Sequence, residues 1–328
     1  MLTSSSNVQI GSVVIGRNEG DRLKRCLNSL LSAAVVYVDS GSSDGSARWA
    51  RDHGNDVVEL DLSVPFTAAR ARNVGLKHLR MVAPGISYVQ FVDGDCELRQ
   101  DWLERAASFL YLHADVGAVC GRRRERYPEG SVYNWLCDRE WDGLPGEVRM
   151  CGGDVMIRLQ AIQAVGGFRE DLIAGEEPEL CVRLRAAGWK IWRLDAEMTL
   201  HDAAMMYFSQ WWRRSLRSGY AFAQGAHIHG APPERHWVWE SRRAWLWGFW
   251  LPILCLVAGL VLWPWGLAAW LIYPLQVLRL TMRGAGPPME RATLVFFQVL
   301  ARFPEAMGQI KFLFGRMFGR QARVIEYK

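Results

Sequence analysis

The chain has 328 residues, 50% of them hydrophobic and 22% charged, with a formal net charge of +5. That length has room for one large domain and a second region, and the charge is too small to indicate a nucleic-acid-binding protein. Seven cysteines without a Cys-x-x-Cys pair argue against a disulfide framework or a zinc site and suit a reducing compartment. The polar residues 1–9 lack the apolar core of a signal peptide, so the catalytic part is expected in the cytoplasm.

Two short apolar runs near the N-terminus predict the first strands of an α/β fold. Residues 8–15 end at the loop 17–19 (Arg-Asn-Glu), and a helix with leucines at spacings of three and four follows. Residues 35–38 run directly into the polar, Gly-rich turn 39–46. A strand, a Gly-rich turn and a helix together present backbone N–H groups and a carboxylate to a nucleotide. An N-capped tight turn would also account for the glycines and serines, but not for Asp39 at the strand end.

A third strand, residues 88–92, ends on Asp93, Gly94 and Asp95. Open α/β folds bind ligands at the carboxyl edge of the sheet, and two carboxylates this close repel each other unless a cation neutralises them or one is protonated. Mg²⁺ or Mn²⁺ is the cation expected beside a diphosphate. A solvated Asp-Gly-Asp turn is the alternative for this motif taken alone.

Taken in order, the segments 17–19, 39–46 and 93–95 resemble the nucleotide-binding half of the family 2 glycosyltransferases, and the resemblance extends over roughly residues 8–205. It implies a GT-A fold, which is a Rossmann-like mixed α/β sheet flanked by helices, and sugar transfer with inversion from a nucleotide-diphosphate sugar. A helical membrane-anchoring region would follow this domain. The resemblance assigns donor or acceptor binding to Arg17, Asn18, Glu19, Asp39, Gly41, Ser42, Asp44, Arg72, Asn73, Asp93, Gly94, Gly153, Asp154, Glu176, Gln210 and Arg213.

Residues 66–75 predict a helix with Thr67 as its N-cap. This helix is similar to the family's helix behind the nucleotide, whose Arg-Asn pair matches Arg72 and Asn73. Arg70 and Arg72 lie on different sides of a helix, so at most one of them faces the site, and Arg72 is favoured. The charged run 122–126, which follows a predicted strand, is first interpreted as a solvated face, with phosphate contact as the alternative.

The acceptor side is predicted from the Gly-rich segment 150–158, which resembles the family's acceptor segment. Gly153 would allow close approach of the backbone to a sugar, and Asp154 could accept hydrogen bonds from sugar hydroxyls.

Three acids, Glu176, Glu177 and Glu179, gather at a predicted helix N-terminus, with Pro178 expected at the first helical position. By resemblance Glu177 matches the catalytic base, with Glu where the family has Asp, while capping and dipole compensation are the alternative roles for these acids. His201 follows the short predicted strand 190–195. In metal-dependent relatives a His at this place completes the site, so Asp93, Asp95 and His201 form the predicted metal ligands, with a structural His as the alternative.

More than half of the sixteen tryptophans lie between Trp211 and Trp270, in the C-terminal region. The segment 208–214 is similar to the Gln-x-x-Arg-Trp element of processive polysaccharide synthases, with Gln210 and Arg213 in place and Arg214 where Trp is expected; an amphipathic helix on the membrane surface is compatible with it. The uncharged run 245–263 is long enough to span hydrocarbon.

A second, shorter run, 265–278, makes this region a hairpin with both ends cytoplasmic by the positive-inside rule, or a re-entrant one. Residues 292–318 predict amphipathic interfacial helices broken at Pro304, or else a helix packed on the catalytic domain. The predicted domains are therefore 1–205 (glycosyltransferase), 206–243 (interfacial helix and linker), 244–283 (transmembrane or re-entrant hairpin) and 284–328 (interfacial helices).

The family resemblance, joined to the chemistry of these residues, implies a metal-dependent inverting glycosyltransferase, and the apolar runs predict a place in the cell inner membrane, with the catalytic domain in the cytoplasm. A UDP-sugar is the donor expected by family habit, although guanosine and thymidine donors occur in similar enzymes. The expected acceptor is a lipid-linked saccharide or an envelope polysaccharide, and membrane lipids are expected partners, whereas nucleic acid is not. A processive polysaccharide synthase, a nucleotidyltransferase and a non-catalytic membrane scaffold remain alternatives.

Overall fold

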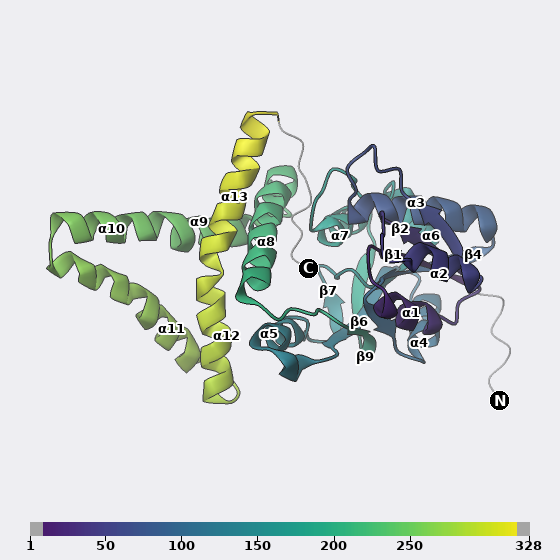
Figure 1. Ribbon diagram of the computed structural model, residues 1–328, viewed down its shortest axis with the longest axis horizontal. Helices are drawn as coiled ribbons and strands as arrows, with labels where there is room; N and C mark the ends of the chain where they lie inside the picture. The colour runs from purple at the N-terminus through teal and green to yellow at the C-terminus, as the bar shows by residue number, and fades with distance from the viewer. Residues whose placement is uncertain (1–8, 320–328) are drawn as a thin grey trace. The chain divides into compact units, whose positions relative to one another are not determined.

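A computed structural model describes residues 9–319, so all but the last residue of the polar N-terminal segment 1–9 lies outside the described residues. The chain divides into two compact units, Met1–Met206 and Tyr207–Lys328. The first is built of strands and helices, and the described residues of the second form helices and their connecting loops (Figure 1).

The first unit contains one mixed nine-stranded sheet in the order β3-β2-β1-β4-β8-β6-β9-β5, with β7 paired to β9. The strands are β1 Gln9–Gly16, β2 Ala34–Asp39, β3 Asp56–Glu59, β4 Ile86–Asp93, β5 Cys96–Leu98, β6 Val116–Glu125, β7 Gly146–Val148, β8 Val155–Arg158 and β9 Lys190–His201. The first four of the sheet order are parallel, and β8 is antiparallel to both β4 and β6. This mixed sheet confirms the fold class predicted from the sequence.

The helices of the first unit connect and cover these strands. They are α1 Asp21–Asn28, α2 Ser46–Asp52, α3 Ala68–Val82, α4 Trp102–Leu112, the 3₁₀ turn η1 Pro128–Gly130, α5 Val132–Glu140, α6 Leu159–Ala164 and α7 Glu176–Ala186. Helix α3 packs on β1 and β2, α6 on β4 and β8, and α4 on β6 and β9. Gly75 lets α3 lie directly against the sheet, since a Cβ at that position would collide with Val13.

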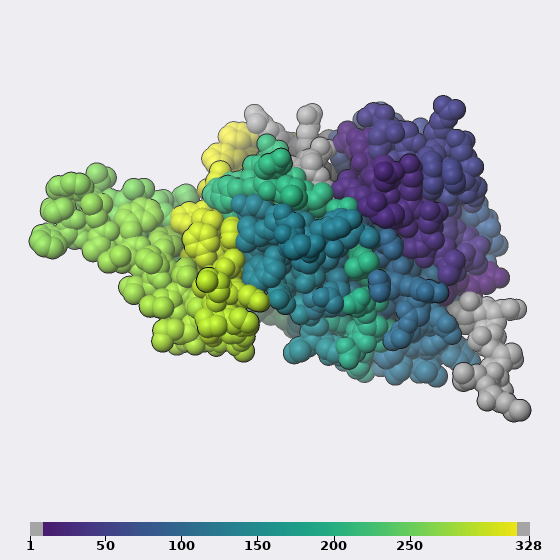
Figure 2. All heavy atoms as spheres, turned by 60° about the horizontal axis from the view of Figure 1, so that its bottom comes forward, coloured from purple at the N-terminus to yellow at the C-terminus, as the bar shows by residue number. Residues whose placement is uncertain are grey.

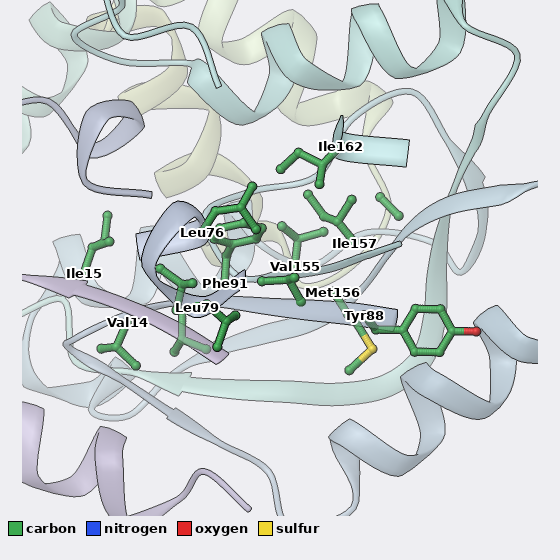
Figure 3. Close-up of a cluster of buried hydrophobic side chains, with 14 of the residues drawn as sticks. Val14, Ile15, Leu76, Leu79, Tyr88, Phe91, Val155, Met156, Ile157 and Ile162 are labelled. Carbon is green, nitrogen blue, oxygen red and sulfur yellow. The ribbon is translucent and has the colours of Figure 1, made fainter. Parts of the chain in front are cut away.

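The core of the first unit follows from continuous apolar runs in the central strands. Parallel strands covered by helices on both faces are buried on both sides and carry near-continuous apolar runs rather than alternation, and β1, β2 and β4 each contain a continuous buried stretch. Phe91 from β4, Val14 from β1, and Leu76 and Leu79 from α3 all belong to this core (Figure 3).

Three element boundaries differ from the sequence prediction. β6 continues to Glu125, so Arg122, Arg123 and Arg124 lie within a strand rather than after one. β9 continues to His201 because its second half pairs with both β6 and β5. Helix α7 begins at Glu176, which puts Pro178 at the third helical position, where the backbone N–H still has no partner within the helix and its loss costs little.

The helices of the second unit are α8 Phe208–His229, α9 Val238–Trp245, η2 Leu246–Trp250, α10 Leu251–Val261, η3 Trp265–Leu271, α11 Ile272–Arg283, α12 Pro288–Leu300 and α13 Arg302–Met317. α13 packs along α8, and its crossing is close because Gly219 and Gly308 have no side chains: a Cβ on either would collide with the backbone of the other helix. The chain breaks between α12 and α13 at Ala301, and Pro304 lies in the first turn of α13 rather than at the break.

Within the described residues of the second unit, one helix is long and apolar enough to cross a membrane. It runs through α9, η2 and α10 from Val238 to Val261, with a mean hydropathy of 2.0 and only 17% of its most apolar window buried. α10 and α11 diverge from a common tip (Figure 1), and their light-green atoms project beyond the yellow residues of α12 and α13 (Figure 2).

Candidate functional site

The first feature of the site is the edge at which the parallel strands β1, β2 and β4 end together. In their register Gly16 lies opposite Asp39, and Ile15 lies opposite Asp93. The loop 17–19, the turn 39–46 and the Asp-Gly-Asp segment therefore leave the sheet at one edge, where open α/β folds bind ligands.

The turn after β2 is held by the buried carboxylate of Asp39. It accepts hydrogen bonds from the Tyr37 hydroxyl at 2.7 Å and from the backbone N–H groups of Gly41 and Ser42 at 3.0 and 2.8 Å. Burial, together with the Asp39 charge, raises the pKa of Tyr37, which therefore stays protonated and can donate this bond. The Asp39 carboxylate thus stabilises the Gly-rich turn by bonding to the backbone of the turn.

The loop after β1 is locked onto this turn. The Asn18 N–H donates to Ser42 Oγ at 2.9 Å, and the Asn18 side-chain oxygen accepts from the Ser43 N–H at 2.8 Å. Asp44 accepts from the N–H of Gly20 at 3.0 Å. Glu19 pairs with Arg22 at 2.9 Å, and the Arg17 guanidinium lies 4.9 Å from the centre of the Phe66 ring. The two loops are therefore one preformed unit.

Arg72 is the central cation of the site and is only 2% exposed. Its Nη2 lies 2.8 Å from Asp93 Oδ1, and its Nη1 lies 2.8 Å from Glu176 Oε1 and 2.6 Å from Glu177 Oε1. Arg70, on another side of α3, instead donates to the carbonyls of Asp61 and Val64 near the surface. Arg72 thus joins the end of β4 to the start of α7.

Thr67 and Asn73, which lie close to Arg72 in the sequence, bond to backbone groups rather than to the charged side chains around Arg72. The Thr67 hydroxyl accepts from the Arg70 N–H at 3.1 Å, the N-cap bond expected from the sequence. The Asn73 side chain bonds both the N–H and the carbonyl of Phe168, at 2.8 Å each. Asn73 therefore fixes the loop that precedes α7.

A second, partly buried arginine, Arg123, belongs to the site although a solvated face was the first interpretation of its charged run. Its Nη2 lies 3.2 Å from Asp93 Oδ2 and 2.8 Å from Asp154 Oδ2. Because successive side chains of a strand point to opposite faces, Arg122 and Arg124 turn to Asp138 and Glu197 instead. If the strand had been predicted to continue through the charged run 122–126, Arg123 would have been expected on the opposite face of the sheet from Arg122 and Arg124.

Asp154 and Gly153 lie beneath the end of β4. Asp154 is 1% exposed and accepts from the Asp93 N–H at 3.0 Å and the Thr199 hydroxyl at 2.8 Å, besides pairing with Arg123. From the sequence, Asp154 was expected to accept hydrogen bonds from sugar hydroxyls, whereas in the structure it accepts one from the backbone of Asp93. Gly153 approaches this cluster closely, since a Cβ there would lie 2.5 Å from Asp93 Oδ2.

The three acids of α7 separate in the structure. Glu176 and Glu177 both contact Arg72, whereas Glu179 pairs with Arg183 one turn later at 2.7 Å. Burial raises the pKa of Glu177 to about 7, with Glu176 and Asp93 adding to the rise and Arg72 opposing it. A carboxylate with such a pKa can exchange a proton near neutral pH.

Two of the three predicted metal ligands lie together. His201 Nε2 is 3.3 Å from Asp95 Oδ2, and the other ring nitrogen, Nδ1, is 3.6 Å from Glu125 Oε2. Burial lowers the pKa of His201, which favours the neutral ring that metals bind. Asp93, the third predicted ligand, has its carboxylate between Arg72 and Arg123. Asp95 and His201 therefore fit a divalent cation, with Glu125 placed to orient the ring.

Gln210 and Arg213, also predicted from the sequence, belong to α8 in the second unit. The Gln210 side chain accepts from the Tyr207 N–H at 2.9 Å and caps the start of that helix, and Arg213 is exposed.

Residues 12–159 match the family model described as glycosyl transferase family 2. Glycosyltransferase AglE of Haloferax volcanii is 26% identical over 203 residues, which are 57% of this chain and 65% of that protein. Succinoglycan biosynthesis protein ExoA of Rhizobium meliloti is 26% identical over 212 residues, 59% of this chain and 62% of that protein. The chain thus matches slightly less than two thirds of the length of these curated relatives.

Among solved structures, the mannosyltransferase PcManGT from Pyrobaculum calidifontis, in complex with GDP-Man and Mn²⁺, superposes with a TM-score of 0.59. It is 18% identical, and the match covers 96% of this chain and 92% of that one, so it establishes a shared fold. The ordered motifs, the mixed sheet and the family match agree, so residues 12–159 are those of a glycosyl transferase family 2 domain, and the fold is of the GT-A type.

Proposed function

We propose that this protein is an inverting glycosyltransferase that moves a sugar from a nucleotide-diphosphate donor to an acceptor hydroxyl. The observation that carries the proposal is the bridge made by Arg72, which binds Asp93 at the donor edge and Glu177 at the start of α7. A non-catalytic scaffold would have no need to bury a proton-accepting carboxylate beside the nucleotide edge.

In this proposal the preformed loops 17–19 and 39–46 bind the base and ribose of the donor. These loops leave the sheet at the carboxyl ends of β1 and β2, where open α/β folds bind nucleotides. PcManGT, which shares the fold, was solved in complex with GDP-Man. For the present chain we propose a nucleotide-diphosphate sugar, with a UDP-sugar as the first candidate.

Glu177 is the proposed base. It takes the proton from the acceptor hydroxyl while that oxygen bonds to the anomeric carbon, and the bond from that carbon to the diphosphate breaks, leaving the nucleoside diphosphate with the electron pair. Arg72 holds the Glu177 carboxylate in place for this step. In-line attack from the face opposite the leaving group inverts the configuration of the anomeric carbon.

Asp95 and His201 are the proposed ligands of a divalent metal, Mg²⁺ or Mn²⁺ by the nature of the family. Such an ion, when bound, neutralises the charge that develops on the diphosphate leaving group. Asp93 is better placed to position Arg72 and Arg123 than to bind the cation, since both of its oxygens already face guanidinium groups.

The second unit is the proposed membrane anchor, attached to the catalytic domain of residues 1–205. The apolar helix Val238–Val261 supports insertion, and Arg242 and Arg243 at its start favour a cytoplasmic end. We assign residues 206–243 to an interfacial helix and linker, 244–283 to the inserted hairpin and 284–328 to interfacial helices. Anchoring at the inner membrane favours a lipid-linked saccharide or an envelope polysaccharide as the acceptor.

The experiment that tests this function is nucleotide binding by the full chain purified in detergent. UDP, GDP and TDP are titrated with and without Mn²⁺ into the wild type, Asp95→Ala and the surface control Asp52→Ala. We expect one nucleotide to bind tightly only with metal, and Asp95→Ala alone to lose that binding. Binding of none of the three would favour the scaffold, and metal-independent binding unaffected by Asp95→Ala would overturn the metal role.

A further inference from the structure

Three different ligand types meet beside the end of β4: a carboxylate from Asp95, a thiol from Cys96 and an imidazole from His201. One ligand atom from each lies within 4.8 Å of the others. Cys96 Sγ is 3.6 Å from Asp95 Oδ1, and Asp95 Oδ2 is 3.3 Å from His201 Nε2. Aspartate, cysteine and histidine are the side chains that bind transition metals in proteins.

Strand pairing explains why Cys96 and His201 share a face. They are direct partners in the antiparallel ladder of β5 and β9, and directly opposed residues have Cβ atoms about 4.5–5.5 Å apart on the same side of the sheet. The extension of β9 to residue 201 therefore brings the imidazole to the thiol. This contact joins residues more than one hundred positions apart in the sequence.

The three side chains of this cluster are also buried, unlike those of a polar cluster on the surface. Asp95, Cys96 and His201 are 7%, 1% and 6% exposed. Among the described residues, His201 Nδ1 is a buried nitrogen without a hydrogen-bond partner, and it faces the Glu125 carboxylate at 3.6 Å. A metal-binding histidine commonly has a carboxylate behind its second ring nitrogen, because the carboxylate fixes the ring and increases its basicity.

A neighbouring group made of Asp93, Cys96 and Asp154 is a weaker candidate. Both of its carboxylates pair with Arg123, and Asp93 pairs with Arg72 as well. These two guanidinium groups already supply the positive charge that a cation would bring. Cys96 therefore lies between two pairs of side chains. One pair, Asp93 and Asp154, is already neutralised by arginine, and the other is Asp95 with His201.

We propose that Cys96 Sγ is a third protein ligand, with Asp95 and His201, of the divalent metal of this protein, and that the site consequently prefers Zn²⁺ or Co²⁺ to Mg²⁺. Thiolate ligands select softer metals, whereas Mg²⁺ takes oxygen ligands in a strict octahedron. Three protein ligands leave an open position, as in catalytic zinc sites, and a diphosphate oxygen can fill it. The thiol loses its proton to solvent when the metal binds.

This inference rests on the metal role proposed above for Asp95 and His201, and Co²⁺ titration of the full chain tests the two separately. A cobalt–thiolate bond gives an intense near-ultraviolet charge-transfer absorption that oxygen and nitrogen ligands do not give. The chain is stripped of metal, and Co²⁺ is added to the wild type, Asp95→Ala, Cys96→Ser and the control Cys26→Ser. Cys26 is a matched control because it is also buried and its Sγ lies 3.6 Å from the Asp93 carbonyl oxygen.

We expect the band in the wild type and in Cys26→Ser, its loss in Cys96→Ser, and Co²⁺ binding weakened by about tenfold or more in that variant. In the wild type, Zn²⁺ should abolish the band at equimolar concentration, whereas a large excess of Mg²⁺ should leave it; this measurement does not depend on the folding of any variant.

The contrary outcomes are distinct. Co²⁺ binding that is lost in Asp95→Ala but gives no thiolate band in the wild type would overturn the role of Cys96 and leave the proposed metal site standing. A band that survives in Cys96→Ser would assign the thiolate to another cysteine. Wild-type protein that binds no Co²⁺ at all would refute both the thiolate ligand and the metal site.

Discussion

At the scale of single residues, the contacts of Arg72 explain how three carboxylates, two of them buried, are held at one place. Its two terminal nitrogens face Asp93, Glu176 and Glu177. Without a cation these acids would repel one another, and protonation would relieve the repulsion. The guanidinium therefore stabilises the charged edge on which the proposed donor and acceptor chemistry depends.

Replacing Arg72 with leucine should destabilise the protein by about 3–5 kcal/mol, because it leaves buried carboxylates without their partner. Arg70→Leu, on another side of the same helix and near the surface, should cost about 0.5 kcal/mol or less. Urea unfolding of both variants measures the difference. Equal stability of the two variants would mean that the carboxylates are satisfied without Arg72.

Glu177→Gln should lower kcat by about 10²–10⁴-fold, since it removes the proposed general base, while nucleotide binding should be retained. Glu179→Gln in the same helix turn is the control, because Glu179 pairs with Arg183. Initial rates at saturating donor compare the two. If Glu179→Gln were the slower enzyme, Glu179 rather than Glu177 would be assigned as the base.

The transfer rate should rise with pH up to about 7 and then level off, because burial raises the pKa of Glu177 to about 7 and the base acts only when unprotonated. A pH profile of kcat/KM gives the position of this ascending limb. An inflection near the ordinary value for Glu, 4.5, would show that Glu177 is not the titrating base.

Only part of this residue-scale arrangement could be predicted from the sequence. The period of a helix places Arg70 and Arg72 on different sides, and the resemblance of the Arg-Asn pair favours Arg72, so this choice needed no tertiary information. Arg123 and Thr199 could not be found in the same way, because their places depend on how far β6 and β9 extend. That Asp154 accepts hydrogen bonds within the fold is likewise set by neighbours distant in the sequence, whereas the Asp39 carboxylate bonds to residues no more than three positions away.

At the scale of elements, the strands and helices whose apolar residues repeat regularly were predicted, and the extended ends of β6 and β9 were not. The second half of β9 alternates apolar and polar residues over only six positions, and it pairs with β6 and β5. Such pairing is decided by partners elsewhere in the chain, since strand preference depends strongly on context.

The close crossing of α8 and α13 gives an element-scale prediction. Alanine is favoured over glycine in a helix by about 1 kcal/mol, yet Gly219→Ala should lower the melting temperature because its Cβ would collide with the Glu305 backbone. Gly259→Ala in α10 should be neutral or stabilising, since its Cβ would meet Leu267 at an ordinary 3.4 Å. Thermal unfolding in detergent compares them, and a stabilised Gly219→Ala would contradict the crossing.

At the scale of the whole molecule, the apolar helix Val238–Val261 predicts where the protein is found in a cell. The wild type should sediment with membranes and resist alkaline extraction. The variant Leu256→Arg/Leu260→Arg should shift to the soluble fraction, because a charge at the centre of a membrane helix costs about 2.5–3.5 kcal/mol. Both leucines are exposed, at 56% and 82%.

Leu112→Arg, at an exposed position of the first unit, is the control and should stay with the membranes. Equal fractionation of all three proteins would show that this helix is not the anchor. The apolar hairpin was predicted from the absence of charged residues alone. This pattern is local in the sequence and does not depend on strand pairing.

The place of β9 in the sheet has a consequence for how the protein is made. β5 pairs with β9, and β9 lies between β5 and β6 in the strand order, so a nascent chain on the ribosome carries two incomplete sheet edges until residues 190–201 emerge. At about 5–20 residues per second, Asp95 and Cys96 leave the ribosome several seconds before His201 can reach them. Synthesis that pauses in this interval would leave the half-formed sheet open to chaperones and proteases, and the last strand would close it.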